Sequence, residues 1–166
     1  HQYRDLAVLA FALAPEQVGF THAWLPEAEM DEVRHQGDRV LVRALDVTNE
    51  AQVVDFVAAV AAKLGRIDGV VNSAGIAADK HVFDTSADLF RKILDVNVVG
   101  TFLVGREAAR HMAKAHRGAI VNVASVSGLR GSKGRSAYGA SKGAVINFTR
   151  TMAAEWGERS MPAIRR

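Results

Sequence analysis

Apolar residues follow two patterns along the chain: short continuous runs, and longer stretches in which they recur every three or four positions. Continuous runs rich in Val and Ile are typical of strands that are buried on both faces of a sheet. The runs of this kind are Arg39–Ala44, Ile67–Asn72 and Ala119–Val123, with Gln17–His22 as a shorter candidate. These runs are short and β-branched, so the sequence predicts strands here and not a helical bundle.

The spaced pattern predicts the helices. Between Asn49 and Gly65, apolar residues recur at i, i+3, i+4 and i+7, as on one face of a helix. Thr48 or Asn49 can cap this helix and Gly65 can end it. The other predicted helices are Arg4–Ala14, Glu27–Gln36, Thr85–Ala115 and Ser136–Trp156. Strands that alternate with such helices form βαβ units, so we expect an α/β fold: a doubly wound, Rossmann-like parallel sheet in three α/β/α layers.

The composition is that of a globular domain. Of the 166 residues, 49% are hydrophobic and 23% are charged, and we expect a single domain over residues 1–166. The chain has no cysteine, which excludes disulfides, thiolate zinc sites and thiol catalysis, and which fits a cytoplasmic location. The net charge of +3 is too scattered to indicate nucleic-acid binding. No apolar run is long enough to span a membrane. His111 and His116 lack the spacing of a helical metal pair, so we expect no metal site.

Polar and small residues follow three of the predicted strands. Asp46 and Val47 come after the first, Asn72 to Gly75 after the second, and Ser125 after the third. In sheets of this kind, ligands bind at the carboxyl ends of the strands, which lie at one edge. We therefore expect these residues to converge on one site.

Two further residues stand near the start of the last predicted helix. Tyr138 and Lys142 are i and i+4, so they share one helix face. An ammonium beside a phenol lowers the phenol pKa from about 10, which suits a general acid or base. Ser125 could hydrogen-bond the oxygen that is protonated. Asn97 lies within an apolar helix, where its amide needs partners such as a kink, a water or a lysine.

Three of these residues also have a purely structural interpretation. Asp46 can be a capping carboxylate, Asn72 can be a turn residue, and Asn97 can simply bend its helix. The glycine-rich segment Gly128–Gly134 is interpreted as a mobile loop beside a substrate cleft. None of these interpretations accounts for the order and spacing of the whole set.

As a set, the residues resemble the classical short-chain dehydrogenases/reductases, over about residues 17–157. The matching pieces are Asp46-Val47, Asn72-Ser73-Ala74-Gly75, Asn97-Val98-Val99-Gly100, Val121-Asn122-Val123-Ala124-Ser125 and Tyr138-Gly139-Ala140-Ser141-Lys142. Ser73 replaces the second Asn that is usual in the family, which is a mild departure.

The resemblance implies an NAD(P)-dependent oxidoreductase that interconverts a secondary alcohol and a carbonyl by hydride transfer. In it, Tyr138 would be the acid/base, Ser125 would polarise the substrate oxygen, and Lys142 would bind the nicotinamide ribose and lower the pKa of Tyr138. Asn97 would hold a water linked to Lys142. The implied cofactor-binding residues are Asp46 and Val47 at the adenine, Asn72, Ala74 and Gly75 at the adjacent ribose and diphosphate, and Tyr138 and Lys142.

The sequence departs from the family pattern at both ends. The family opens with a strand and a Gly-x-x-x-Gly-x-Gly turn, but no glycine precedes Gly19, so we expect that strand and turn to lie before His1. After Arg159, the tail Ser160–Arg166 does not resemble the family's next strand, so the C-terminal strands are also expected to be missing. The alternative function is therefore a catalytically impaired fragment or a non-enzymatic remnant.

Cofactor choice and partners follow from the same resemblance. The segment Thr21–Ala23 lacks the acidic residue that NAD users place after the second strand, which favours NADP over NAD. The family packs its two long helices between subunits, so a homo-oligomer (dimer or tetramer) is implied, with a small alcohol or carbonyl as substrate.

Overall fold

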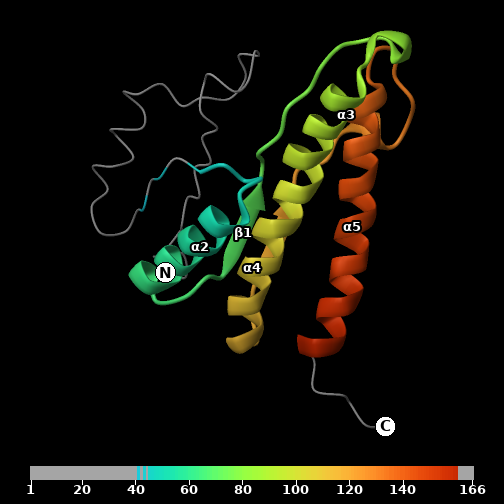
Figure 1. Cartoon of the computed structure of the whole chain (residues 1–166). Helices are drawn as coiled ribbons and strands as arrows, with labels where there is room; N and C mark the ends of the chain where they lie inside the picture. The colour runs from blue at the N-terminus through green and yellow to red at the C-terminus, as the bar shows by residue number, and fades with distance from the viewer. Residues whose placement is uncertain (1–40, 42, 44, 161–166) are drawn as a thin grey trace, which may run out of the picture.

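The computed structural model describes residues 41, 43 and 45–160, with side chains as far as Trp156. In this part of the chain, helices alternate with two short strands (Figure 1). The elements are α2 (Glu50–Leu64), β1 (Gly69–Asn72), η3 (Val82–Asp84), α3 (Ala87–Leu94), η4 (Asp95–Gly100), α4 (Thr101–Lys114), β2 (Ala119–Asn122), η5 (Val126–Gly128) and α5 (Ser136–Ser160).

Local signals fix both ends of α2. The Asn49 side chain accepts a hydrogen bond from the backbone N–H of Gln52, at 3.1 Å, and so satisfies a donor that the first turn leaves free. Gly65 ends the helix in the left-handed region, with φ at 78°, where glycine carries no Cβ penalty. Both predicted ends of this helix are confirmed, with Asn49 as the cap.

The helix predicted at Thr85–Ala115 is observed as one continuous helical stretch from Ala87 to Lys114, with a change of winding inside it. Ser86 caps α3, and α4 ends at Lys114. Between them, residues 95–100 form the π-helical segment η4, which is a common device at functional sites. Gly100, at its end, lets the chain pass close to Val47, because an added Cβ would lie 2.6 Å from a methyl group of Val47.

The two strands pair in parallel. Their register sets Gly69 against Ala119 and Asn72 against Asn122. Val70 and Asn72 are buried on the face that α4 covers, whereas Val71 and Val121, on the opposite face, are 53% and 56% exposed. The period of two that is expected of strands is therefore visible in the burial pattern.

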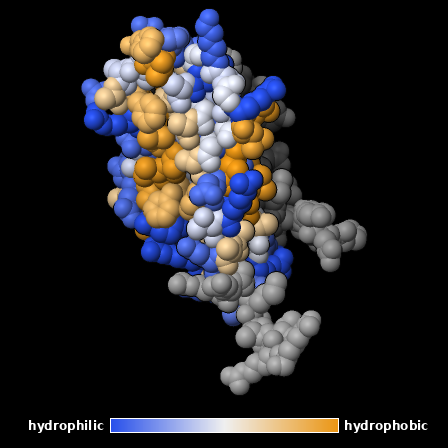
Figure 2. All heavy atoms as spheres, turned by 90° about the vertical axis from the view of Figure 1, so that its right-hand side faces the viewer, coloured by the Kyte–Doolittle hydropathy of each residue, from blue (hydrophilic) through white to orange (hydrophobic). Residues whose placement is uncertain are grey.

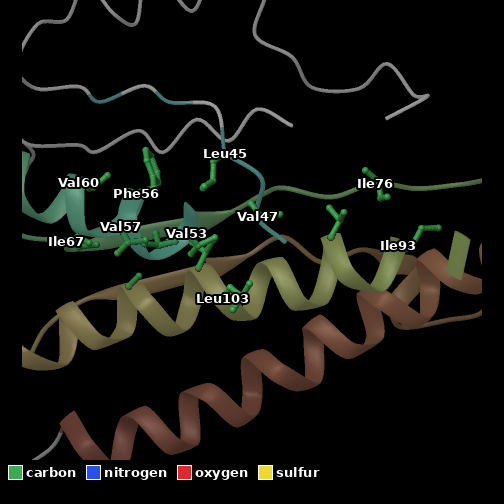
Figure 3. Close-up of a cluster of buried hydrophobic side chains, with 14 of the residues drawn as sticks. Leu45, Val47, Val53, Phe56, Val57, Val60, Ile67, Ile76, Ile93 and Leu103 are labelled. Carbon is green, nitrogen blue, oxygen red and sulfur yellow. The ribbon is translucent and has the colours of Figure 1, made fainter. Parts of the chain in front are cut away.

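One apolar core joins α2 to α4 (Figure 3). α4 lies between α2 and α5, and β1 packs against it (Figure 1). The buried residues of α2 are Val53, Phe56, Val57 and Val60. They share the cluster with residues of α4 such as Leu103 and Val104. This is the face that the i, i+3, i+4, i+7 pattern predicts.

Several sequence predictions need correction at their boundaries. The strand predicted at Ile67 begins at Gly69, because its partner begins only at Ala119. In the predicted strand Arg39–Ala44, the described residues Leu41 and Arg43 are not in a strand, since no described segment pairs with them and a strand needs a partner for its backbone groups. The last helix continues to Ser160. The predicted elements at residues 4–14, 17–22 and 27–36 lie outside the described residues.

Candidate active site

The site lies where the strands end and α5 begins, and the buried Lys142 defines its centre. This side chain is 5% exposed, and its Nζ donates a hydrogen bond to the carbonyl oxygen of Val123 at 2.7 Å. Burial lowers the pKa of Lys142, because it penalises the charged ammonium. An added Cβ on Gly75 would lie 3.6 Å from the same Nζ. The ammonium is therefore placed between the end of β2 and the turn that follows β1.

Tyr138 lies one helical turn before Lys142 and is half-buried. The Lys142 Nζ lies 5.8 Å from the centroid of the Tyr138 ring, and the guanidinium carbon of Arg135 lies 5.4 Å from it. Two cations thus lie within about 6 Å of the ring, the range over which a ring face attracts positive charge. The predicted sharing of one helix face by Tyr138 and Lys142 is borne out by this contact.

Ser125 is held at the end of β2 by the short helix η5. It caps η5, and its Oγ accepts a hydrogen bond from the N–H of Ser127 at 3.2 Å. η5 in turn lies directly on α5. A Cβ added at Gly128 would come within 2.5 Å of the carbonyl carbon of Lys142, and one at Gly139 within 2.8 Å of the Ser127 oxygen. Glycine at both positions allows the backbones to touch, which brings the segment that carries Ser125 against the turn that carries Tyr138 and Lys142.

Asn97 is fully buried, in η4. Its Oδ1 accepts from the N–H of Ile76 at 2.7 Å, and its Nδ2 donates to the Ile76 oxygen at 2.9 Å and to Ser141 Oγ at 2.9 Å. The amide is therefore satisfied at both ends, as a buried amide must be. The prediction that Asn97 needs partners is confirmed, and the partners are the Ile76 backbone and Ser141.

The likeness to known proteins extends over most of the chain. The family model described as short chain dehydrogenase matches residues 20–165. The chain belongs to this family. Cyclopentanol dehydrogenase of Comamonas testosteroni is 44% identical over 124 residues, which cover 75% of this chain and 50% of that protein. The resemblance to the short-chain dehydrogenases/reductases that the motifs indicate is thus confirmed.

Solved structures agree. NAD+-bound xylitol dehydrogenase matches with a TM-score of 0.79 and 33% identity, covering 92% of this chain and 56% of that one. ElxO with NADP bound matches with a TM-score of 0.74 and 34% identity, covering 80% and 54%. These matches confirm the α/β, Rossmann-like fold class. The chain spans about half the length of the curated relatives it matches.

The residues predicted to bind the cofactor differ in how deeply they are buried and in the hydrogen bonds that they make. Asn72 is 5% exposed, and its amide donates to Asn122 Oδ1 at 2.8 Å across the strand pair. Asp46 Oδ1 accepts from both the N–H and the hydroxyl of Thr48, at 2.9 and 2.7 Å, so it stabilises the turn before α2, whereas the cap of that helix is Asn49. Val47 is 1% exposed. The roles of these residues toward a dinucleotide stay predictions.

The turn residues Ala74 and Gly75 are more open. Ala74 is half-buried and Gly75 is exposed, so the backbone of this turn is accessible beside Lys142. Their contact with a cofactor also stays a prediction.

Sequence reasoning missed one pair of charged residues. Arg135 forms an ion pair with Asp79, at 2.6 Å between Nε and Oδ1, and the same guanidinium lies over the Tyr138 ring. Lys80 N–H donates to the Gly134 oxygen at 3.0 Å, so two loops meet here. Arg135 immediately precedes α5, and its place three positions before Tyr138 is the signal that could have identified it.

Within the described ranges, no helix is long and apolar enough to cross a membrane, and no group of three potential metal-ligating side chains occurs. The cytoplasmic location stays a prediction from the sequence.

Proposed function

We propose that this chain carries the catalytic centre of an NAD(P)-dependent oxidoreductase that interconverts a secondary alcohol and a carbonyl. The observation that carries the proposal is the buried Lys142, with its Nζ 5.8 Å from the ring centroid of Tyr138 and hydrogen-bonded to the strand that leads to Ser125. A cation, a phenol and a hydroxyl at one edge of a parallel sheet are the parts that such proton transfer requires.

The residues at this edge also fit a nicotinamide dinucleotide. Lys142 has three N–H donors, of which one bonds the Val123 oxygen. Glycine at position 75 lets the exposed turn pass close to the ammonium, since an added Cβ would lie 3.6 Å from Lys142 Nζ. Lys142 would therefore hold the ribose hydroxyls, and the turn formed by Ala74 and Gly75 would lie against the ribose and diphosphate. The cofactor, when bound, supplies the hydride acceptor or donor.

The chain's own side chains handle the proton. The Tyr138 hydroxyl exchanges a proton with the substrate oxygen, and Ser125 donates a hydrogen bond to that oxygen and so stabilises the charge that develops on it. Asn97 holds Ile76, the residue after the cofactor turn, through both backbone groups. Two of the solved relatives hold different dinucleotides, so the preference for NADP stays a prediction from the sequence.

The test uses the full chain, with NAD+ and NADP+ supplied separately and a series of secondary alcohols, while the absorbance of the reduced nicotinamide is followed. Tyr138→Phe is expected to lower turnover by at least about a hundredfold, with an unchanged circular dichroism spectrum, because it removes only the hydroxyl. Full turnover by this variant would refute the assignment. A folded wild-type chain without turnover would favour the alternative of an impaired or non-enzymatic remnant.

We also propose a homo-oligomer that forms through the α4–α5 face. Phe102 of α4 is 39% exposed and meets Phe148 of α5 edge to face, with ring centroids 5.9 Å apart; Val99 of the adjoining η4 is 41% exposed. Figure 2, which views the side of α5, shows hydrophobic residues gathered in patches. An exposed apolar patch is typical of an interface. Phe102→Asp is expected to shift the assembly to monomer in analytical ultracentrifugation, and an unchanged mass would contradict the proposal.

A further inference from the structure

Ser141 lies between Tyr138 and Lys142 in sequence order and is completely buried. Its hydroxyl donates to the carbonyl oxygen of Tyr138 at 2.7 Å, and it accepts from Asn97 Nδ2 at 2.9 Å. A serine hydroxyl has a single hydrogen. Because that hydrogen is used on Tyr138, Ser141 can meet Asn97 only as an acceptor.

This polarity decides which end of the Asn97 amide faces α5. As observed, the NH2 group faces Ser141 and the Ile76 oxygen, and Oδ1 faces the Ile76 N–H. A flipped amide would set two acceptors against each other at Ser141 and at the Ile76 oxygen, and two donors at the Ile76 nitrogen. Unpaired polar groups are costly in a buried site. Ser141 therefore contributes to a single orientation of Asn97.

The same hydrogen bonds form a relay across three segments. It runs from the first turn of α5 through Ser141 and Asn97 to Ile76, the residue that follows Gly75. At Gly75 an added Cβ would lie 3.2 Å from Asn97 Oδ1 and 3.6 Å from Lys142 Nζ, so the turn packs closely against both side chains. A change in the Asn97 amide would move the turn beside the ammonium.

We infer that Ser141 is a positioning residue, which sets the Asn97 amide and thereby holds the Ile76 turn in register with Tyr138 and Lys142. The inference rests on the proposed function for its catalytic consequence. Its structural content, the orientation of Asn97 and the protection of the Ile76 N–H, stands on the hydrogen bonds alone.

The same helix offers a matched control at Thr149. Its hydroxyl also donates to a carbonyl of its own helix, that of Val145 at 2.7 Å, and accepts from an asparagine amide, Asn122 Nδ2 at 2.9 Å. This contact joins α5 to Asn122 of β2, and the two hydrogen bonds of the Thr149 hydroxyl go to Val145 and Asn122 and not to the Asn97 amide. Ser141→Ala and Thr149→Val each remove one hydroxyl of the same kind.

Both variants are expected to lower the Tm to a similar degree. Only Ser141→Ala is expected to lower kcat, by roughly tenfold, as a small misplacement of catalytic groups does, with little change in the KM for the cofactor. Equal kcat losses in the two variants, or a wild-type kcat in Ser141→Ala, would overturn the inference.

A second measurement needs no turnover. Amide hydrogen exchange of Ile76 is expected to speed up in Ser141→Ala and to stay at the wild-type rate in Thr149→Val. If the wild-type chain shows no turnover, the proposed function fails while this measurement still decides the role of Ser141. Unchanged exchange at Ile76 in Ser141→Ala would overturn the inference whatever the activity.

Discussion

α2 and α5 are both held to the rest of the molecule by one face, but by different chemistry. The buried side chains of α2 are all apolar: Val53, Phe56, Val57 and Val60. Among the described side chains of α5, the buried residues are Ala137, Ser141, Lys142 and Val145, half of which are polar. α5 also meets η5 through backbone contacts at glycines.

The contacts of α2 mainly stabilise the fold, whereas those of α5 mainly position the residues of the site. Apolar burial at α2 is strong but non-directional, so it stabilises the fold without fixing any single atom. The hydrogen bonds and backbone contacts at α5 contribute less each, but they specify distances and donor–acceptor polarity. A substitution at α2 should therefore change stability alone, whereas one at α5 should change catalysis more than stability.

The largest expected loss of stability comes from Phe56→Ala. Phe56 is fully buried at the centre of the α2 face, and such truncations cost about 3–5 kcal/mol. Urea denaturation measures this loss, and turnover per folded molecule is expected to be unchanged. Val54→Ala, at a position 39% exposed on the same helix, is the control with little expected effect. A large fall in the turnover of folded Phe56→Ala would contradict the view that α2 contributes to stability and not to catalysis.

A smaller loss of stability with a larger loss of function is expected from Gly128→Ala. The added Cβ would lie 2.5 Å from the Lys142 carbonyl carbon and 2.6 Å from the Gly143 nitrogen, and backbone atoms cannot move aside individually. Overpacking of this kind costs about 1–3 kcal/mol. It should also push η5 away from α5 and lower kcat by tenfold or more, because small displacements of catalytic groups slow the reaction strongly.

The control for this prediction lies in the same loop. Gly131 has open space around its Cβ position, so Gly131→Ala is expected to leave both stability and kcat near the wild-type values. Equal effects of the two alanine variants would show that the close contact at Gly128 does not position the site.

Local features of the sequence were sufficient for part of this picture. Asn49 and Gly65 end α2 as predicted, because caps depend on neighbouring residues only. The shared face of Tyr138 and Lys142 follows from helical spacing. The need of Asn97 for partners follows from its apolar surroundings. Each of these signals lies within a few residues of its consequence.

Contacts between distant segments could not be predicted in the same way. Asn97 and Ile76 are 21 positions apart, and Asn72 and Asn122 are 50 apart. The latter pair depends on the register of two strands, which no local pattern fixes. The pairing of Arg135 with Asp79 depends likewise on how two loops meet.

The smallest expected effect is a dependence of stability on pH that comes from Lys142. Burial lowers the pKa of Lys142, so between this lowered value and the ordinary value of about 10.4 the unfolded chain binds more protons than the folded chain. The free energy of unfolding therefore rises with pH across that window, and the cost of burying the charge is fully present below it. Lys142→Met carries no charge at any pH and should lose this rise.

Urea denaturation of both proteins from neutral to alkaline pH measures the difference directly. The stability of Lys142→Met relative to the wild type is expected to be greatest at neutral pH and to decline as the pH rises, whereas losing the hydrogen bond to Val123 should add an offset that does not vary with pH. A difference that stays constant with pH would mean that the ammonium is not penalised by burial. The comparison between the two helices would then rest on Ser141 and the glycine contacts alone.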